Sequence, residues 1–181
     1  MLLDGMTIEL IPHCESTSPH GWTGDHDLRP LTETGTAQAR ALVPALGTNI
    51  EAVYSSPALR CMQTVQPLAD VLTQPVREVP ELLETRGFTG PREWTEGPFQ
   101  PIAASLGGAW AAGKALNALM AIARAHPGKR VVACSHGDVI PALLAMLCAA
   151  YDAALPPIAG RGGWHTLLFE GGYLVCSSQL A

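Results

Sequence analysis

The chain has 181 residues and a mass of 19.1 kDa, which suits a single globular domain over residues 1–181. Lys and Arg number 11 against 16 Asp and Glu, and the net charge of −5 excludes a general nucleic-acid binder, which needs a basic excess. Hydrophobic residues make up 48% and charged residues 15%, which excludes a disordered chain and predicts a sizeable core.

Strands and helices alternate along most of the predicted chain. β-branched and apolar runs predict four strands, at 7–12, 51–56, 75–79 and 130–135. Apolar spacing of three and four residues predicts helices at 36–46, 57–72, 102–126 and 137–150. The segment 84–101 is predicted to be a long irregular loop, and 164–178 a hairpin that turns at Gly171–Gly172. This order predicts a three-layer αβα sandwich, an α/β fold with a mostly parallel sheet and helices on both faces.

Cysteine usage and the terminal sequence indicate where the protein is found. An odd number of cysteines without a C-x-x-C pair predicts reduced thiols at Cys14, Cys61, Cys134, Cys148 and Cys176. The start, MLLDGMTIELIP, is acidic where an export signal is basic, and the longest apolar run, 139–151, is too short for a membrane span. We therefore expect a soluble cytoplasmic protein with neither a membrane nor a nucleic acid as partner. No pattern in the sequence indicates an oligomeric state.

Residues that can carry chemistry follow four of the predicted strands. His13 follows the first strand and His136 the fourth, while Ser56–Arg60 and Glu84 follow the second and third. Because functional sites of such sheets lie at the carboxyl ends of the strands, we expect these segments to meet at one edge.

The chemistry of these side chains suits phosphoryl transfer. A neutral imidazole such as that of His13 is nucleophilic near pH 7. Arg60, beside the free N–H groups of a helix start, can hold an anion, and Gly137 in the SHGD turn lets backbone approach a ligand. Glu84 can act as a general acid for a leaving alkoxide, a role worth about 10²–10⁴ in rate.

Five segments in this order resemble the histidine phosphatase (phosphoglycerate mutase-like) superfamily: IPHCES, DLRPLTETGTAQARAL, VYSSPALRCMQTVQPLAD, EVPELLE and VVACSHGDVIPALL. The resemblance covers about residues 8–177. The stretches GWTGDHDLRPLT and GGWHTLLFEGGYLV look most like the short bacterial phosphohistidine-phosphatase branch. They also resemble the phosphatase-like domain attached to some Nudix hydrolases.

The resemblance implies cleavage of a phosphomonoester or phosphohistidine through a phosphohistidine on His13. The partner is then a small phosphorylated substrate or a phosphoprotein. Arg60 and His136 match positions that hold phosphoryl oxygens, and Ser16 matches a frequent hydroxyl ligand. Glu84 matches the proton donor. Neither a metal nor an organic cofactor is implied, because Arg and His take the place of a cation.

Two positions near the expected site leave alternatives open. Glu81 lies close enough in sequence to Glu84 to be the proton donor instead. Arg29 is either a phosphate ligand or an ion-pair partner of nearby carboxylates.

One departure from the family pattern concerns the residue before His13. The family motif begins with Arg-His, whereas this chain has Pro12 in place of the arginine, and proline also lacks an N–H. Loss of one such donor commonly costs on the order of 10²–10³ in rate. The sequence therefore predicts a weakened or specialised phosphatase, with noncatalytic binding of a phosphorylated ligand as the alternative. Three other arginines are candidates to fill the gap: Arg29, Arg86 and Arg161.

Two rival chemistries begin at the same motif. His13-Cys14-x₅-His20 resembles the cysteine-phosphatase signature His-Cys-x₅-Arg, in which a thiolate attacks phosphorus, although histidine replaces the closing arginine. Alternatively, His13, Cys14, His20 and His26 are a candidate zinc set, although their spacing fits no common structural pattern.

Overall fold

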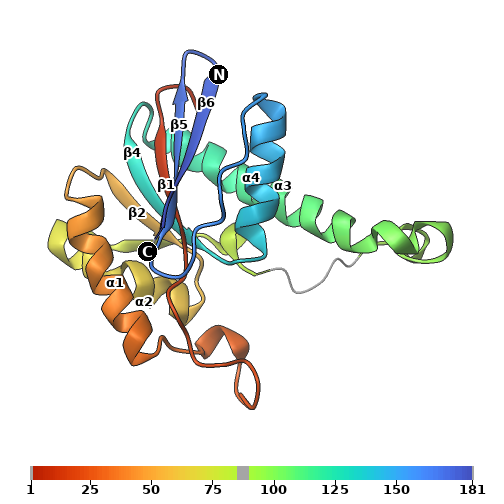
Figure 1. Ribbon diagram of the computed structural model, residues 1–181, viewed down its shortest axis with the longest axis horizontal. Helices are drawn as coiled ribbons and strands as arrows, with labels where there is room; N and C mark the ends of the chain where they lie inside the picture. The colour runs from red at the N-terminus through yellow and green to blue at the C-terminus, as the bar shows by residue number, and fades with distance from the viewer. Residues whose placement is uncertain (1, 85–89, 181) are drawn as a thin grey trace.

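The computed structural model describes residues 2–84 and 90–180, which form a mixed six-stranded sheet in the order β3-β2-β4-β1-β5-β6 (Figure 1). Neighbouring strands among β3, β2, β4 and β1 run parallel, whereas β5 is antiparallel to β1 and β6 to β5. The predicted α/β fold is confirmed, and the antiparallel part comes from the predicted hairpin. The strands are β1 Thr7–Pro12, β2 Ala52–Ser55, β3 Val76–Glu78, β4 Arg130–Ser135, β5 Trp164–Glu170 and β6 Tyr173–Gln179.

Four α-helices cover the two faces of the sheet, so the described chain has three layers (Figure 1). One pair packs on one face around a core that includes Leu42, Leu68 and Val132, and the other pair on the opposite face around Leu119, Leu143 and Val131. Val131 and Val132 point to opposite faces because side chains alternate along a strand. The helices are α1 Glu33–Leu46, α2 Leu59–Leu72, α3 Ala103–Ala125 and α4 Val139–Ala150.

The main differences from the predicted elements lie at helix ends and in the loop before α3. Helix α1 begins three residues earlier than predicted, because the Thr32 side chain caps it by accepting the N–H of Gly35. The described part of segment 84–101 contains two 3-10 turns, at Arg92–Trp94 and Gly97–Ile102. These turns lie at the outer end of α3, which extends away from the sheet (Figure 1).

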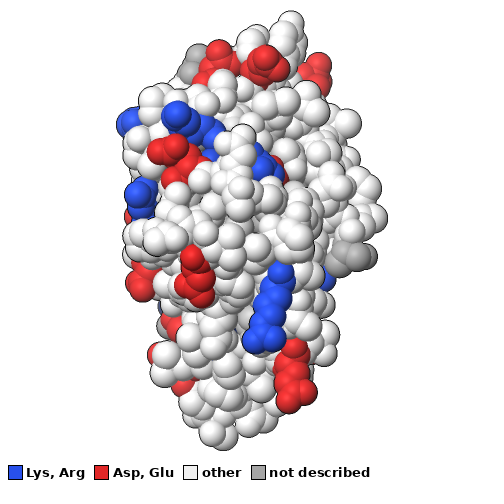
Figure 2. Space-filling view, turned by 90° about the vertical axis from the view of Figure 1, so that its left-hand side faces the viewer, with Lys and Arg blue, Asp and Glu red and all other residues white. Residues whose placement is uncertain are grey.

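Charged side chains are scattered over the face shown in Figure 2, where basic and acidic groups lie among uncharged ones. In the part of the chain that the structure describes, no helix combines the length and apolar character needed to cross a bilayer.

Gly35, in the first turn of α1, lies directly against the segment that follows β1. A Cβ atom at this position would lie 1.9 Å from the main-chain oxygen of Glu15. Glu15 is two residues beyond His13, and its oxygen accepts the N–H of Thr32 at 3.0 Å. Only glycine therefore permits this close approach of α1 to the loop after β1.

We expect Gly35→Ala to lower the free energy of unfolding by about 3 kcal/mol, since backbone must move to relieve the overlap. The matched control is Gly113→Ala on the exposed side of α3, where an added Cβ meets nothing within 4 Å. That change should stabilise the protein by about 0.5–1 kcal/mol, because alanine favours a helix. Urea unfolding measures both values, and equal effects of the two substitutions would contradict the prediction.

Candidate active site

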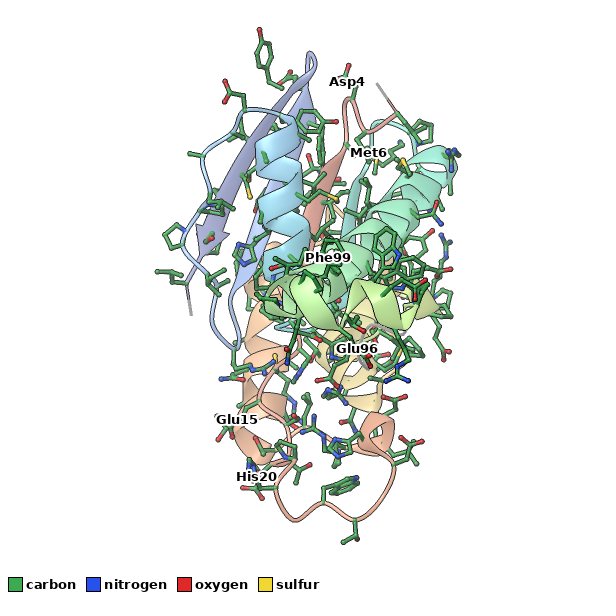
Figure 3. All side chains as sticks on the ribbon, turned by 90° about the vertical axis from the view of Figure 1, so that its right-hand side faces the viewer. Asp4, Met6, Glu15, His20, Glu96 and Phe99 are labelled. Atoms are coloured by element: carbon green, nitrogen blue, oxygen red, sulfur yellow. The ribbon has the colours of Figure 1, made fainter. Side chains whose placement is uncertain are left out.

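His13 and His136 directly follow the neighbouring parallel strands β1 and β4, so both lie at the edge of the sheet that the carboxyl ends of these strands form. Pro12 on β1 is paired in register with Ser135 on β4, and the N–H of His13 donates to the Ser135 oxygen at 3.0 Å. The two imidazole rings are consequently 5.5 Å apart between centroids, at an interplanar angle of 67°. Only 5% of His13 and 1% of His136 is exposed. In Figure 3, Glu15 and His20 lie beyond this edge, while Asp4 lies at the opposite end of the sheet.

The protonation of His13 is fixed by its own backbone neighbourhood. Its Nδ1 lies 2.8 Å from the main-chain oxygen of Cys14, and a carbonyl only accepts, so Nδ1 carries the proton and donates. Burial, with the positive charge of Arg161, lowers the pKa of His13 to about 3. At neutral pH, His13 is therefore a neutral imidazole whose Nε2 has a lone pair.

His136 is held between a hydroxyl and a guanidinium. Its Nδ1 lies 3.2 Å from Nη2 of Arg60, and because a guanidinium only donates, Nδ1 is the acceptor. The proton therefore sits on Nε2, which lies 2.8 Å from Oγ of Ser56. Burial and then Arg60 lower the pKa of His136 to about 2. The motif spacing does not predict the Ser56 contact, which depends on how β2 and β4 are paired.

Arg60 connects the groups at this edge. It is fully buried, and its Nη1 donates to the His26 oxygen at 2.8 Å while its Nη2 donates to Oε2 of Glu84 at 2.7 Å. Its buried Nε has no hydrogen-bond partner among the described residues. A buried guanidinium with an unused N–H is suited to receive an anion.

Of the two glutamates considered as proton donor, Glu84 is at the site. Its side chain, 39% exposed, pairs with Arg60. Glu81 instead lines a separate cavity of about 280 Å³ beside Tyr54 and Ile122. The geometry thus favours Glu84 in that role.

The other predicted phosphate-binding residues surround these groups in different ways. Nη1 of Arg29 donates to the Thr17 oxygen at 2.6 Å and lies 3.4 Å from Oγ of Ser16, while its Nε is buried without a partner among the described residues. Burial, and after it the positive charge of Arg60, lowers the pKa of Arg29. Gly137 is exposed at the turn between β4 and α4, with open space where a Cβ would be.

Two arginines considered as replacements at position 12 differ in their contacts. Nη1 of Arg161 donates to the main-chain oxygen of His13 at 2.6 Å. Arg29 instead bonds the Thr17 oxygen. Arg86 lies outside the described residues.

The structure does not support either rival chemistry. Cys14 is fully buried, and burial raises the pKa of its thiol to about 11, so it is a thiol rather than a nucleophilic thiolate at neutral pH. Within residues 2–84 and 90–180, no three His, Cys, Asp or Glu side chains are grouped so as to hold a metal ion. All five cysteines are free.

We expect the free energy of unfolding to fall as the pH is lowered below about 6.5. The pKa values of His13 and His136, about 3 and about 2, lie below the value of 6.5 expected on unfolding, so unfolding takes up protons in this range. Each histidine contributes about 1.4 kcal/mol per pH unit to this slope. Urea unfolding at pH 6 and pH 5 gives the change in the free energy of unfolding per pH unit. We expect this change to be smaller in His13→Asn than in the wild type by about the amount that one histidine contributes. Equal changes in the two proteins would contradict the lowered pKa of His13.

The match to known proteins covers nearly all of the chain. The family model of the histidine phosphatase superfamily (branch 1) matches residues 8–172. The chain belongs to the histidine phosphatase superfamily. The predicted family is thus confirmed, and membership supports the general class of hydrolases acting on phosphoric monoesters. The finer resemblance to the short phosphohistidine-phosphatase branch stays a prediction.

Individual proteins that match this member of the superfamily differ from it at most positions. It is 30% identical over 173 residues to an 8-oxo-(d)GTP phosphatase of Mycolicibacterium smegmatis, covering 93% of this chain and 46% of that protein. The chain spans less than half the length of the curated relatives it matches. Bacillus stearothermophilus YhfR shares its fold with a TM-score of 0.70 at 22% identity, covering 94% of each chain. The protein histidine phosphatase SixA complexed with tungstate has a TM-score of 0.56 at 20% identity and the same coverage.

Proposed function

We propose that this histidine phosphatase hydrolyses a phosphomonoester or a phosphohistidine through a covalent intermediate on Nε2 of His13. The observation that carries the proposal is the hydrogen bond from Nδ1 of His13 to the Cys14 oxygen at 2.8 Å. This bond places the proton on Nδ1 and leaves the Nε2 lone pair for attack on phosphorus. The lowered pKa of His13, about 3, keeps that lone pair available throughout the neutral range.

The first step transfers the phosphoryl group to the protein. Nε2 of His13 forms a bond to phosphorus while the bond from phosphorus to the leaving oxygen breaks, and that oxygen takes a proton from Glu84. A phosphoryl oxygen on Nη2 of Arg60 would take the place that the Glu84 carboxylate holds at 2.7 Å.

The second step releases inorganic phosphate. Water attacks phosphorus and gives a proton to Glu84, and the bond to Nε2 of His13 breaks, which restores both side chains. Arg60, whose guanidinium already contacts the ring of His136, would hold the phosphoryl oxygens through both steps. His136 would join it by turning its Nε2–H from the Ser56 hydroxyl to a phosphoryl oxygen. Ser16, Arg29 and the backbone at Gly137 complete the proposed set of phosphate ligands.

The substrate class remains broad in this proposal, since the relatives are named for different substrates, a nucleotide in one case and a protein phosphohistidine in another. Pro12 in the motif favours a weakened or specialised enzyme. The loop before α3 stays the predicted source of leaving-group specificity. Its described part contributes Trp94, Phe99 and Ile102 to an apolar hollow of about 340 Å³.

The decisive experiment compares turnover of a generic aryl phosphate by the wild type and by His13→Ala, without added metal. Turnover by the wild type alone supports the enzyme. If both proteins are inactive while orthophosphate still binds, the chain is a noncatalytic phosphate-ligand binder instead.

A further inference from the structure

We propose that Arg161 supplies the guanidinium that holds the transferring phosphoryl group beside His13, in place of the motif arginine that Pro12 replaces. The inference rests on the proposed function, and it makes Arg161 a further catalytic residue of this site. Its partner would be the phosphoryl oxygens of the substrate and of the phosphohistidine intermediate.

The sheet topology brings Arg161 to the right place. Strand β5 runs antiparallel to β1, with Leu10 opposite His165, so the residues just before β5 lie beside the end of β1. Arg161 is three residues before the start of β5, and His13 is the first residue after β1. The arginine expected from position 12 therefore has a substitute on the adjacent strand connection.

The contact of Arg161 with the nucleophilic residue is direct. Its Nη1 donates to the main-chain oxygen of His13 at 2.6 Å, which uses one of the five N–H donors of a guanidinium. The residue is exposed, and in our proposal its remaining donors face the ligand bound at His13. Its charge also acts on both rings, because it helps to lower the pKa of His13 and of His136.

The loop that carries Arg161 is held in place on both sides of it. Nε2 of His165 accepts the N–H of Ala159 at 3.2 Å, which leaves the His165 proton on Nδ1, 2.9 Å from Oγ of Ser178. The Ser178 hydroxyl donates in turn to the oxygen of Pro157. Beyond Arg161, the N–H of Gly163 donates to the oxygen of Gly160 at 3.1 Å. A guanidinium fixed in this way needs little reorganisation to bind a phosphoryl group.

The test measures kcat/KM on an aryl phosphate and the Kd of orthovanadate for the wild type and Arg161→Ala. Arg124→Ala is the matched control, because Arg124 is also exposed but lies far from the site. It is in the last turn of α3, which leads into the start of β4, whereas the site is at the carboxyl end of that strand. We expect Arg161→Ala to lower kcat/KM by about 10²–10³ and to weaken vanadate binding, with Arg124→Ala within about twofold of the wild type.

The double variant Pro12→Arg with Arg161→Ala separates phosphate binding from a purely structural role. If Arg161 acts through its charge on the phosphoryl group, an arginine at position 12 can take over that role. The double variant should then have a kcat/KM at least tenfold higher than Arg161→Ala, an effect on the order of that of one such donor. If Arg161 only holds the main-chain oxygen of His13, the double variant should stay as slow as Arg161→Ala. An arginine side chain at position 12, the residue directly before His13, cannot make that hydrogen bond. Failure of this rescue therefore overturns the proposal.

The outcomes distinguish the inference from the function on which it rests. If the wild type turns over substrate and Arg161→Ala matches it, Arg161 has no such role, although the phosphatase activity is supported. If the wild type only binds vanadate and Arg161→Ala binds it equally well, Arg161 again has no such role. If the wild type binds vanadate without turnover, weaker binding by Arg161→Ala with recovery in the double variant still supports Arg161 as a phosphate ligand. A wild type that neither hydrolyses the ester nor binds vanadate overturns both proposals.

Discussion

Replacing His13 by Asn should abolish turnover, lowering kcat by about 10⁴-fold or more, because the covalent route then has no nucleophile. The asparagine amide can still donate to the Cys14 oxygen in place of Nδ1, which donates at 2.8 Å in the wild type. The variant therefore keeps the backbone contact and loses only the reactive Nε2. Rapid quenching with labelled substrate should trap an acid-labile phosphoprotein in the wild type and none in the variant.

The matched control for this result is Cys14→Ser. Because burial raises the pKa of the Cys14 thiol to about 11, we expect this variant to keep its turnover within a few-fold. Loss of turnover in a folded Cys14→Ser protein, with His13→Asn still active, would transfer the nucleophile from the imidazole to the thiol. Circular dichroism on both variants establishes that they are folded.

Replacing Arg60 by Ala should lower kcat/KM by about 10³-fold or more, because one side chain contacts several members of the site. Its Nη2 lies 2.7 Å from Oε2 of Glu84 and 3.2 Å from Nδ1 of His136, and its Nη1 holds the His26 oxygen at 2.8 Å. The change removes a charge that the phosphoryl group would meet and frees both neighbours from their present positions.

Arg60→Lys tests whether the forked shape matters as well as the charge. A lysine keeps the charge but cannot span these three contacts, so we expect it to recover less than a tenth of the lost kcat/KM. The control is Arg77→Ala. Arg77 lies on the edge strand β3, where its guanidinium donates to the Tyr54 hydroxyl at 3.1 Å. Full activity in Arg60→Lys would mean that a point charge suffices there.

Much of the fold follows from local patterns in the sequence. The apolar runs at 7–12 and 130–135 coincide with β1 and β4, and the paired glycines at 171 and 172 adopt positive φ in the turn between β5 and β6. Helix starts were less well predicted, because capping by Thr32 extends α1 beyond the apolar pattern. The apolar periodicity of a sequence indicates which residues are buried, whereas the start of a helix depends on where its first N–H groups find acceptors.

For the candidate site too, part could be predicted from the sequence and part depends on tertiary packing. The order of motifs along the chain, with His13 and His136 each directly after a strand, was enough to predict that these residues meet, since neighbouring parallel strands have their carboxyl ends on the same side of the sheet. It could not choose between Glu81 and Glu84, because only two residues separate them and only tertiary packing turns Glu84 towards Arg60.

The sequence by itself determined the family, the α/β fold and the residue types that could take part in phosphoryl transfer, because these depend on motifs and local periodicity. Only the tertiary structure decided which nitrogen of each histidine holds a proton and which arginine stands beside His13. Those properties arise from contacts between segments distant in the chain, such as Arg161 with the His13 oxygen. Antiparallel pairing of β5 with β1 creates that contact, and no local pattern near residue 13 encodes it.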